Sequence, residues 1–369
     1  MTEQPRNLLI LGASYGTLPA IRLLMAGHRV RLVCTSATAA LIAREGVRVR
    51  FPGRAGTAPV EVASRTLPGE LTASVPEATD PRGFDLVVLA MQEAHYAAPE
   101  VRTLLAGIAR ERVPCLAIMN MPPLAYLERL GGLDTAALAS CYADASVWRG
   151  FDPALVSLAS PDPQAFRPAG EPKNVLEVGL PTNFKAARFE AEAPTALLRQ
   201  LEADIEACRL QRDGAAIELP VKLKVHDSRY VPLAKWPMLI AGNYRCIRAD
   251  GMVSIREAVH ADPGRSRAIY EWVIGLCLRL GAAEADLVPF DKYARAAESL
   301  GRPSSAARAL FAGAGHIERV DALVQRIGAQ LGLRSAALDE IVARVDALLA
   351  RNRARTPQAP REPRAAAVG

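Results

Sequence analysis

The first residues of the chain place small side chains at a spacing that could bind a phosphate group. Gly12, Ser14 and Gly16 follow an apolar run at 7–11 and precede a helical pattern. A glycine turn between a strand and a helix offers free backbone N–H groups and the positive end of the helix dipole to an anion. The pattern G-x-S-x-G is one residue shorter than G-x-G-x-x-G, but its strand and helix context matches. The predicted cofactor-binding residues of this turn are Gly12, Ala13, Ser14, Tyr15 and Gly16. The alternative is an ordinary strand–helix turn without a ligand.

The residues after the second predicted strand, at 29–33, bear on the choice of cofactor. A site for NAD usually places Asp or Glu there to bind the ribose 2′-hydroxyl. This chain has Cys34, Thr35 and Ser36 at that place, with Arg44 downstream. Because hydroxyls and a nearby cation suit a 2′-phosphate, the sequence favours NADP(H), with Thr35 and Ser36 as further cofactor-binding residues.

Length and composition place the chain among globular proteins with two domains. Its 369 residues are half hydrophobic, enough to bury two cores. The six cysteines are scattered without C-x-x-C pairs or metal-ligand spacing, which predicts free thiols, a reducing compartment and no metal. Neither a signal peptide nor an apolar run of about 18 residues is present. We therefore expect a cytoplasmic protein without membrane contact.

The formal net charge of +6 raises the question of a nucleic-acid partner. Much of the excess lies in the arginine- and proline-rich tail at 351–369, which cannot bury an apolar face and is predicted to be disordered. The rest of the chain has no basic stripe interleaved with aromatic residues. The expected partner is a small-molecule substrate, not a nucleic acid.

Strand and helix patterns alternate in the first part of the chain and give way to helices in the second. The predicted strands are 46–51, 85–91, 114–120, 155–159, 174–180 and a short one near Ile217, with helices at 97–110, 123–130 and 193–208. The later helices are 233–245, 266–280, 304–312, 317–331 and 335–351. Such alternation predicts an α/β domain with a doubly wound parallel sheet of the Rossmann type at 1–225, followed by an all-helical substrate and dimerisation domain at 226–350. Substrates usually bind in the cleft between two such domains.

The order and spacing of several segments resemble the ketopantoate reductases (2-dehydropantoate 2-reductases, PanE/ApbA type), as a divergent member. The resemblance rests on GASYG, MAGHRVRLV, DLVVLAM, Asn120 after the next strand, LAKWPMLIAGN, IYEWVIGLCLRLG and SSAARALFAGAGHIERVDALVQRIG. It covers most of the chain. It implies a helical domain like the C-terminal domain of 6-phosphogluconate dehydrogenase, a homodimer, and NADPH-dependent reduction of a 2-oxo acid to a 2-hydroxy acid.

The resemblance also implies roles for individual residues. Lys235 matches the lysine that donates a proton to the substrate carbonyl as hydride arrives, and an ammonium there would stabilise the developing alkoxide. Asn120 matches an asparagine at the carboxyl end of a strand, where its amide would hold the lysine or the nicotinamide. Asn243, about two helical turns after Lys235, matches a substrate-binding asparagine. Met91 and Gln92, after the strand at 85–91, would contact the cofactor together with Asn120.

Departures from the family pattern indicate a different substrate. Leu239 stands where the family has another asparagine, Gln92 where it has a lysine, and Met121 where it has a glycine. The family's substrate-binding glutamate falls on His316 or, with a small shift, on Glu318, and its serine on Ser304 or Ser305. The predicted substrate-binding residues are Asn243, Leu239, Ser304, His316 and Glu318. Because Leu239 offers no hydrogen bond, we expect a substrate larger or less polar than ketopantoate.

The span between Asn120 and Lys235 is longer than the family pattern needs. The extra residues fall around 148–172, where they would form a lid or a subunit contact and, with Trp148, Arg149 and Phe151, line the pocket. Two alternatives remain beside the reductase. One is an opine- or 3-hydroxyacid-type dehydrogenase, and the other is a non-catalytic NADP-binding sensor.

Overall fold

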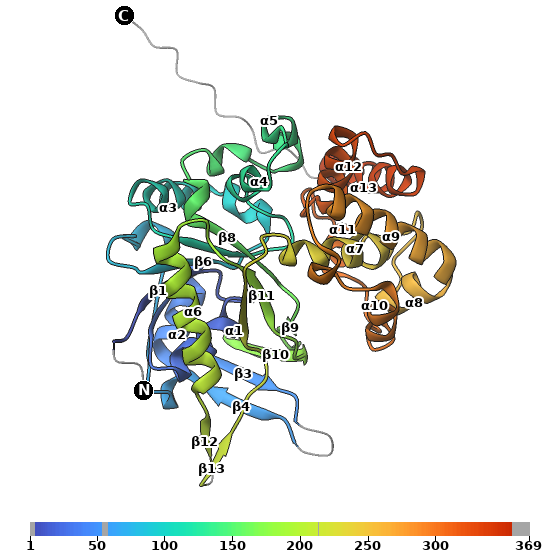
Figure 1. Cartoon of the computed structure of the whole chain (residues 1–369). Coiled ribbons are helices and arrows are strands. Elements are labelled where there is room, and N and C mark those ends of the chain that lie inside the picture. The colour runs from blue at the N-terminus through green and yellow to red at the C-terminus, as the bar shows by residue number, and fades with distance from the viewer. Residues whose placement is uncertain (1–3, 54–57, 213, 356–369) are drawn as a thin grey trace, which may run out of the picture.

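The computed structural model describes residues 4–53, 58–212 and 214–355. Its main sheet has eight strands in the order β14-β11-β8-β7-β6-β1-β2-β5 (Figure 1). Their bounds are β1 Asn7–Leu11, β2 Arg29–Val33, β5 Glu70–Ser74, β6 Leu86–Leu89, β7 Cys115–Ile118, β8 Val156–Ser160, β11 Phe184–Ala187 and β14 Leu223–His226. The Rossmann-type sheet predicted from the sequence is confirmed.

The direction of the strands departs from a fully parallel sheet at one edge. The six strands from β8 to β5 are mutually parallel, whereas β11 pairs with β8 antiparallel and β14 follows β11 in direction. The carboxyl ends of the parallel strands therefore share one edge of the sheet. That edge carries the residues of the candidate site.

A smaller sheet takes up strands that the sequence analysis had assigned to the main one. It has the order β4-β3-β10-β9, with β3 Arg48–Phe51, β4 Val60–Ala63, β9 Gln164–Phe166 and β10 Val175–Leu180. The predicted strand near Ile217 is also outside the main sheet, in a hairpin of β12 Leu210–Arg212 and β13 Ala215–Ile217. The hydropathy pattern of a single strand does not show which sheet the strand joins, because strand pairing depends on residues far away in the sequence.

Alternate residues of β1 face the two sides of the main sheet, as the two-residue period of a strand requires. Leu8 and Ile10 pack with α1 (Thr17–Met25) and α6 (Glu192–Ala207), which lies across the sheet in Figure 1. Leu9 and Leu11 belong to the core that includes α3 (Pro99–Arg110) and continues into the helical part of the chain. One apolar core therefore joins the sheet to the helices that follow it.

The second part of the described chain is helical. After α2 Ser36–Glu45, α4 Leu124–Leu127 and α5 Thr135–Leu138 in the first part, the helices are α7 Lys235–Met238, α8 Ile255–His260, α9 Pro263–Arg279, α10 Phe290–Ala297, α11 Ser305–Phe311, α12 Val320–Gln330 and α13 Ala336–Arg355. The short helices α8 and α10 were not predicted. Because α13 continues to Arg355, the predicted disordered tail is wrong for 351–355, and its remainder, 356–369, lies outside the described residues.

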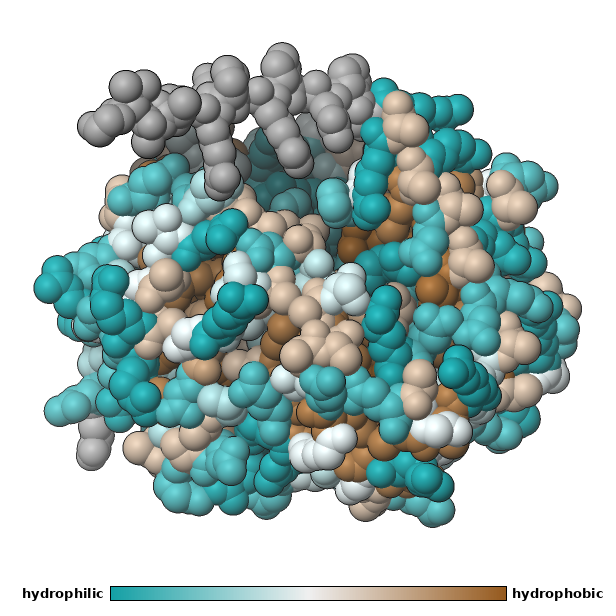
Figure 2. Space-filling model, turned by 90° about the horizontal axis from the view of Figure 1, so that it is seen from above, coloured by the Kyte–Doolittle hydropathy of each residue, from teal (hydrophilic) through white to brown (hydrophobic). Residues whose placement is uncertain are grey.

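Hydrophilic side chains predominate on the face shown in Figure 2. Among the described residues, Met252 is the one large hydrophobic side chain that is exposed. No helix in the described ranges is long and apolar enough to cross a membrane, and no group of potential ligands there could hold a metal ion.

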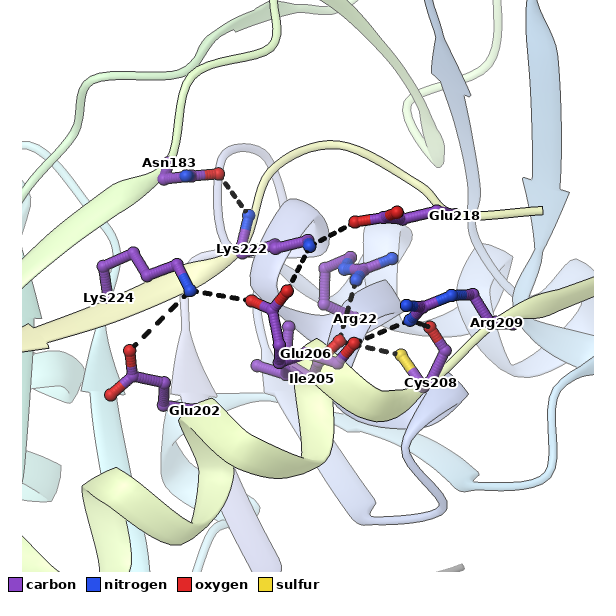
Figure 3. A network of polar contacts seen from close by, with 10 residues as sticks. All are labelled: Arg22, Asn183, Glu202, Ile205, Glu206, Cys208, Arg209, Glu218, Lys222 and Lys224. Atoms are coloured by element: carbon purple, nitrogen blue, oxygen red, sulfur yellow. Dashed lines mark hydrogen bonds and ion pairs between the residues drawn. The ribbon is translucent and has the colours of Figure 1, made fainter.

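A buried arginine ties α1 to the end of α6 (Figure 3). Arg22 is 1% exposed, and its Nη2 donates to the carbonyl oxygen of Ile205 at 3.0 Å. Around this contact Lys222 pairs with Glu206 and Glu218, while Lys224 lies 2.7 Å from Glu206. The cationic side chains thus satisfy carbonyl and carboxylate groups at the carboxyl end of α6, where the helix dipole favours positive charge.

Replacing Arg22 by alanine should lower the free energy of unfolding by about 2–4 kcal/mol, because the change leaves a cavity and an unsatisfied carbonyl at Ile205. Urea denaturation followed by circular dichroism measures the change. Arg29→Ala, which removes an exposed side chain 3.8 Å from Glu70, is the matched control and should change stability by less than about 0.5 kcal/mol. Equal effects of the two substitutions would contradict the structural role of Arg22.

Candidate functional site

The glycine turn lies at the point where the strand order reverses, between β1 and β6. Gly12 has φ +109°, and a Cβ there would stand 2.7 Å from Met91 Cγ and 2.8 Å from the carbonyl oxygen of Ala90. A Cβ at Gly16 would stand 2.2 Å from the carbonyl oxygen of Gly12. Gly12 is therefore required by the close approach of the turn to the end of β6, and Gly16 by the tightness of the turn itself. In open α/β sheets, ligands bind in the crevice at this reversal.

The backbone of the turn is available to an anion. Within the described chain, the N–H groups of Ser14, Tyr15 and Gly16 have no protein acceptor, and the Ser14 side chain is exposed. These groups precede α1, whose N-terminus adds the positive end of its dipole. The turn thus offers donors and space for the pyrophosphate of a dinucleotide. After β2, Thr35 and Ser36 are exposed, and the Thr35 hydroxyl donates to Thr38 Oγ1.

Asn120 follows β7 at the same edge, as predicted, but its partner is a carboxylate. Its Nδ2 donates to Glu318 Oε2 at 3.1 Å, while its buried Oδ1 has no hydrogen-bond partner among the described residues. No described contact joins Asn120 to Lys235. Of the two candidates His316 and Glu318, the structure therefore brings Glu318 to Asn120, whereas His316 is exposed near Arg353.

A second carboxylate, not predicted from the sequence, lies beside Glu318. Glu93 directly follows Gln92, is 1% exposed, and accepts hydrogen bonds from the Ala143 N–H at 3.0 and 3.1 Å. Its own N–H donates to Glu318 Oε1 at 3.3 Å. Burial raises the pKa of Glu93 to about 7 and that of Glu318 to about 6, and the charge of Glu318 adds to the rise for Glu93. The predicted neighbour Gln92 is exposed.

Lys235 is held by an aspartate that follows β8. Its Nζ lies 3.3 Å from Asp162 Oδ1, and the two side chains are only 16% and 14% exposed. Asp162 also lies 3.5 Å from Lys185 Nζ and accepts from Ser160 Oγ at 3.0 Å. Burial works against the charged carboxylate, but the two ammonium groups outweigh it and keep the pKa of Asp162 below its ordinary value. Lys235 is thus a positioned ammonium, not a freely moving surface side chain.

The segment around Asp162 also contacts the glycine turn. Tyr15 Oη donates to the carbonyl oxygen of Pro163 at 2.6 Å, and its ring packs edge-on against Phe184 at 5.9 Å. Tyr15 and Lys235 therefore meet the same short segment from two sides. This contact places the Lys235 ammonium near the edge of the sheet that carries the turn.

A π-helical stretch at Leu239–Asn243 follows α7 and changes the face on which Asn243 lies. In a regular α-helix, eight residues turn the chain by about 800°, which would put Asn243 about 80° from Lys235. Here the Tyr244 N–H donates to the carbonyl oxygen of Leu239 at 2.9 Å, the wider i+5 turn in which each residue rotates less. Asn243 consequently returns toward the Lys235 face, and its amide has no partner within the described chain.

Other predicted substrate residues support the fold instead of facing an open site. Ser304 is 3% exposed and caps α11, accepting from the Ala307 N–H at 3.2 Å while donating to the carbonyl oxygen of Asn243 at 2.7 Å. Leu239 is 3% exposed within the core. Ser304 is therefore a helix cap that fixes the backbone of Asn243, and Leu239 gives the site an apolar lining at most.

The predicted lid around 148–172 divides into two parts. Trp148 is 2% exposed and packs against Tyr96 and Phe151 at centroid distances of 5.3 and 5.9 Å, while Arg149 is exposed. Trp148 and Phe151 thus belong to the core on the α3 side, and the prediction that they line the pocket is wrong. The second part, from Asp162 to Arg167, is the one that reaches the site.

Comparisons with known proteins agree with this architecture. No protein-family model and no curated protein matches the sequence. Among solved structures, a putative ketopantoate reductase from Ralstonia solanacearum MolK2 has a TM-score of 0.63 at 16% identity, over 95% of this chain and 99% of that one. The chain has the ketopantoate reductase fold. A dimeric ketopantoate reductase from Staphylococcus aureus has a TM-score of 0.58 at 12% identity, over 94% and 99% of the two chains.

The same fold is found in a dehydrogenase with a different name. D-mandelate dehydrogenase, solved with NADH and anilino(oxo)acetate, has a TM-score of 0.62 at 13% identity, over 94% of this chain and 99% of that one. The resemblance drawn from the sequence motifs is thus confirmed at the level of the ketopantoate reductase fold.

The carboxylates Glu93 and Glu318 should make stability depend on pH. Their pKa values are raised from an ordinary 4.5 to about 7 and about 6, so the folded state binds their protons more tightly than the unfolded chain. Their contribution to stability is full below about pH 4.5 and is lost as the pH rises to about 7. Glu318→Gln removes one of these titrations, and the new amide can donate to Asn120 Oδ1 after a flip. Between about pH 5 and pH 8 the variant should gain about 1 kcal/mol over the wild type.

Chemical denaturation at a series of pH values measures this difference. Glu192→Gln, at a side chain that is 82% exposed, is the control and should leave the pH profile unchanged. A Glu318→Gln profile that runs parallel to the wild type would show that Glu318 titrates normally.

Proposed function

We propose that the protein is an NADPH-dependent oxidoreductase that reduces a 2-oxo acid to a 2-hydroxy acid. The observation that carries the proposal is the Lys235–Asp162 pair, held by one short segment against the glycine turn at the reversal point of the sheet. The turn supports the binding of a dinucleotide, because its backbone N–H groups have no protein acceptor within the described chain. Its glycines stand where a Cβ would collide with neighbouring atoms, so the turn packs tightly. The pair supports proton transfer, because a largely buried ammonium that is held in one direction by Asp162 can act as a positioned acid.

The bound nicotinamide would supply the hydride. Lys235 Nζ would donate its proton to the carbonyl oxygen and stabilise the negative charge that develops there, while Asp162 keeps the ammonium in place. The unpaired amide of Asn243 would bind the substrate hydroxyl or carboxylate. Asn120, fixed by Glu318, would direct its free Oδ1 to the nicotinamide amide. Asn120 would act from the edge of the sheet, and Lys235 and Asn243 from the helical part of the chain.

The apolar residue Leu239 favours a substrate other than ketopantoate. The hydroxylated 2-oxo acid ketopantoate would need a hydrogen bond where this chain supplies a buried methyl group. That D-mandelate dehydrogenase shares the fold is consistent with a 2-oxo acid that carries a larger apolar group. We therefore propose 2-oxo acids with bulky side chains as the first substrates to test.

A second candidate is the reduction of an imine, as in an opine-type dehydrogenase. It is favoured by Glu93 and Glu318, two neighbouring carboxylates beside Asn120. Their negative charge would attract a protonated imine, which is positive, and repel a further carboxylate on the substrate. Supplying each 2-oxo acid with and without an amino acid separates the two candidates. Turnover that requires the amine would favour the opine-type reaction.

Lys235→Ala should lower kcat by about a hundredfold or more, because the carbonyl oxygen loses its proton donor. The dissociation constant of NADPH should change little. Steady-state oxidation of NADPH by 2-oxo acids measures the first quantity, and calorimetric titration the second. Lys292→Ala, at an exposed lysine of α10, is the control and should keep full activity.

Two outcomes would contradict the proposed mechanism. Undiminished turnover by Lys235→Ala would exclude Lys235 as the acid. A wild-type protein that binds NADPH but reduces no carbonyl or imine would instead favour a cofactor-binding sensor.

We also propose a homodimer, since one neighbour of the same fold is described as dimeric. Only Met252 is a large exposed hydrophobic side chain in the described ranges, so the interface would be largely polar. Light scattering on purified protein should give twice the mass of one chain. The mass of a single chain at micromolar concentration would exclude a stable dimer.

A further inference from the structure

The end of β2 has hydroxyl groups but no local cation. Cys34, Thr35 and Ser36 stand there, and Arg44, the cation expected from the sequence, lies at the other end of α2. Eight residues of helix separate Arg44 from Ser36, a rise of about 12 Å. Arg44 also pairs with Glu45 at 2.7 Å, and its carbonyl oxygen accepts from Arg65. Arg44 is therefore badly placed to neutralise a group bound at the end of β2.

Arg167 brings a cation to this place from a distant part of the chain. It follows β9 in the smaller sheet, and its Nη2 donates to the carbonyl oxygen of Ala13 in the glycine turn at 3.2 Å. In the same turn, the Gly12 N–H donates to the carbonyl oxygen of Val33 at 2.9 Å, so the turn lies against the end of β2. The guanidinium thus lies against the turn, which adjoins the strand end that faces the ribose in dinucleotide-binding sheets.

Arg167 has no acidic partner among the described residues. No carboxylate there forms an ion pair with it, and Ala13 accepts from only one of its five N–H groups. Arg50, on β3 of the same smaller sheet, is paired instead: it lies 2.7 Å from Glu61 and 2.9 Å from Glu171. An arginine with free donors on the turn, together with two exposed hydroxyls at the strand end that the turn contacts, has the composition of a phosphate site.

The segment that carries Arg167 is fixed at several points. The carbonyl oxygen of Pro163 accepts from Tyr15, and Asp162 pairs with Lys235 and Lys185. The ring of Phe166 lies 4.8 Å from the guanidinium of Arg302 in the helical part. These contacts hold the backbone of Arg167 over the glycine turn, so that the cost of ordering its side chain on a ligand is reduced.

We propose that Arg167 binds the 2′-phosphate of NADPH, together with the hydroxyls of Thr35 and Ser36. This assignment rests on the proposed function, because it concerns the cofactor of the same site. The pyrophosphate is already served by the amides of Ser14, Tyr15 and Gly16, which leaves the 2′-phosphate as the anion without a cation. The guanidinium can keep its hydrogen bond to the Ala13 carbonyl oxygen while it binds the phosphate, because its remaining N–H donors are enough for a bidentate contact.

The experiment compares ligands that differ in the 2′-phosphate alone. Binding of NADPH, NADH, 2′,5′-ADP and 5′-AMP is measured by calorimetry on the wild type, on Arg167→Ala and on the control Arg44→Ala. Arg167→Ala should weaken NADPH and 2′,5′-ADP by about tenfold or more. It should leave NADH and 5′-AMP within about twofold. Arg167→Lys, which keeps the charge but not the fork of donors, should lie between the two.

The possible failures are distinguishable. Equal weakening of NADPH and NADH binding by Arg167→Ala would overturn the assignment and give Arg167 a role at the pyrophosphate or in stabilising the fold. Unchanged binding of all four ligands would also overturn it. A wild-type protein that binds NADH more tightly than NADPH would overturn the assignment of Arg167 to a 2′-phosphate, while the proposed oxidoreductase activity would stand. A wild type that binds none of the four ligands would overturn the proposed function itself. Unchanged thermal unfolding of the variants shows that binding, not folding, is being compared.

Discussion

The close approach of the glycine turn to the end of β6 is the constraint on which the rest of the site depends. Gly12 can stand there only because it lacks a side chain, since a Cβ would meet the carbonyl oxygen of Ala90 at 2.8 Å. This contact brings the turn to the reversal point of the sheet, with its amides free. It also sets Tyr15 where its hydroxyl reaches Pro163, so the position of the neighbouring segment follows from the same packing.

The helical part of the chain is fixed to this edge by apolar packing and by a few polar contacts. Residues of β1 and α3 share one core with the helices that follow the sheet. Tyr244, next to Asn243, donates to the carbonyl oxygen of Glu318 and accepts from the Val320 N–H at 3.0 Å. The loop that brings Glu318 to Asn120 is thereby attached to the element that carries Asn243.

Much of the fold could be predicted from the sequence because its signals are local. Short apolar runs marked β1, β2 and β6, and the glycine spacing marked the turn. Lys235 and Asn120 were proposed from a motif order; the comparisons support the fold that this order implies, and the roles of the two residues stay predictions. The assignment of β3 and β10 to the smaller sheet could not be predicted, because strand pairing is decided by residues more than a hundred positions apart. The π-helical turn at Leu239–Asn243 has no local signal either.

The site residues that were missed fall into two kinds. Asp162 follows a parallel strand, the same signal that identified Asn120, and could have been found by applying that rule to β8. Arg167 could not, because nothing in its neighbourhood indicates that β9 folds back over residue 13. Trp148 and Phe151 were assigned to a pocket on composition, although large aromatic residues more often fill a core, as they do here.

The short stretch from Asp162 to Arg167 has a consequence for how such a protein can change during evolution. Its two ends contact different partners, Lys235 and the carbonyl oxygen of Ala13. An insertion or deletion of one residue between them would displace both contacts at once, whereas substitution of Arg167 alone would leave the Lys235 contact in place. Point mutations, not changes of loop length, are therefore the accessible route by which lineages of this fold could diverge at this segment.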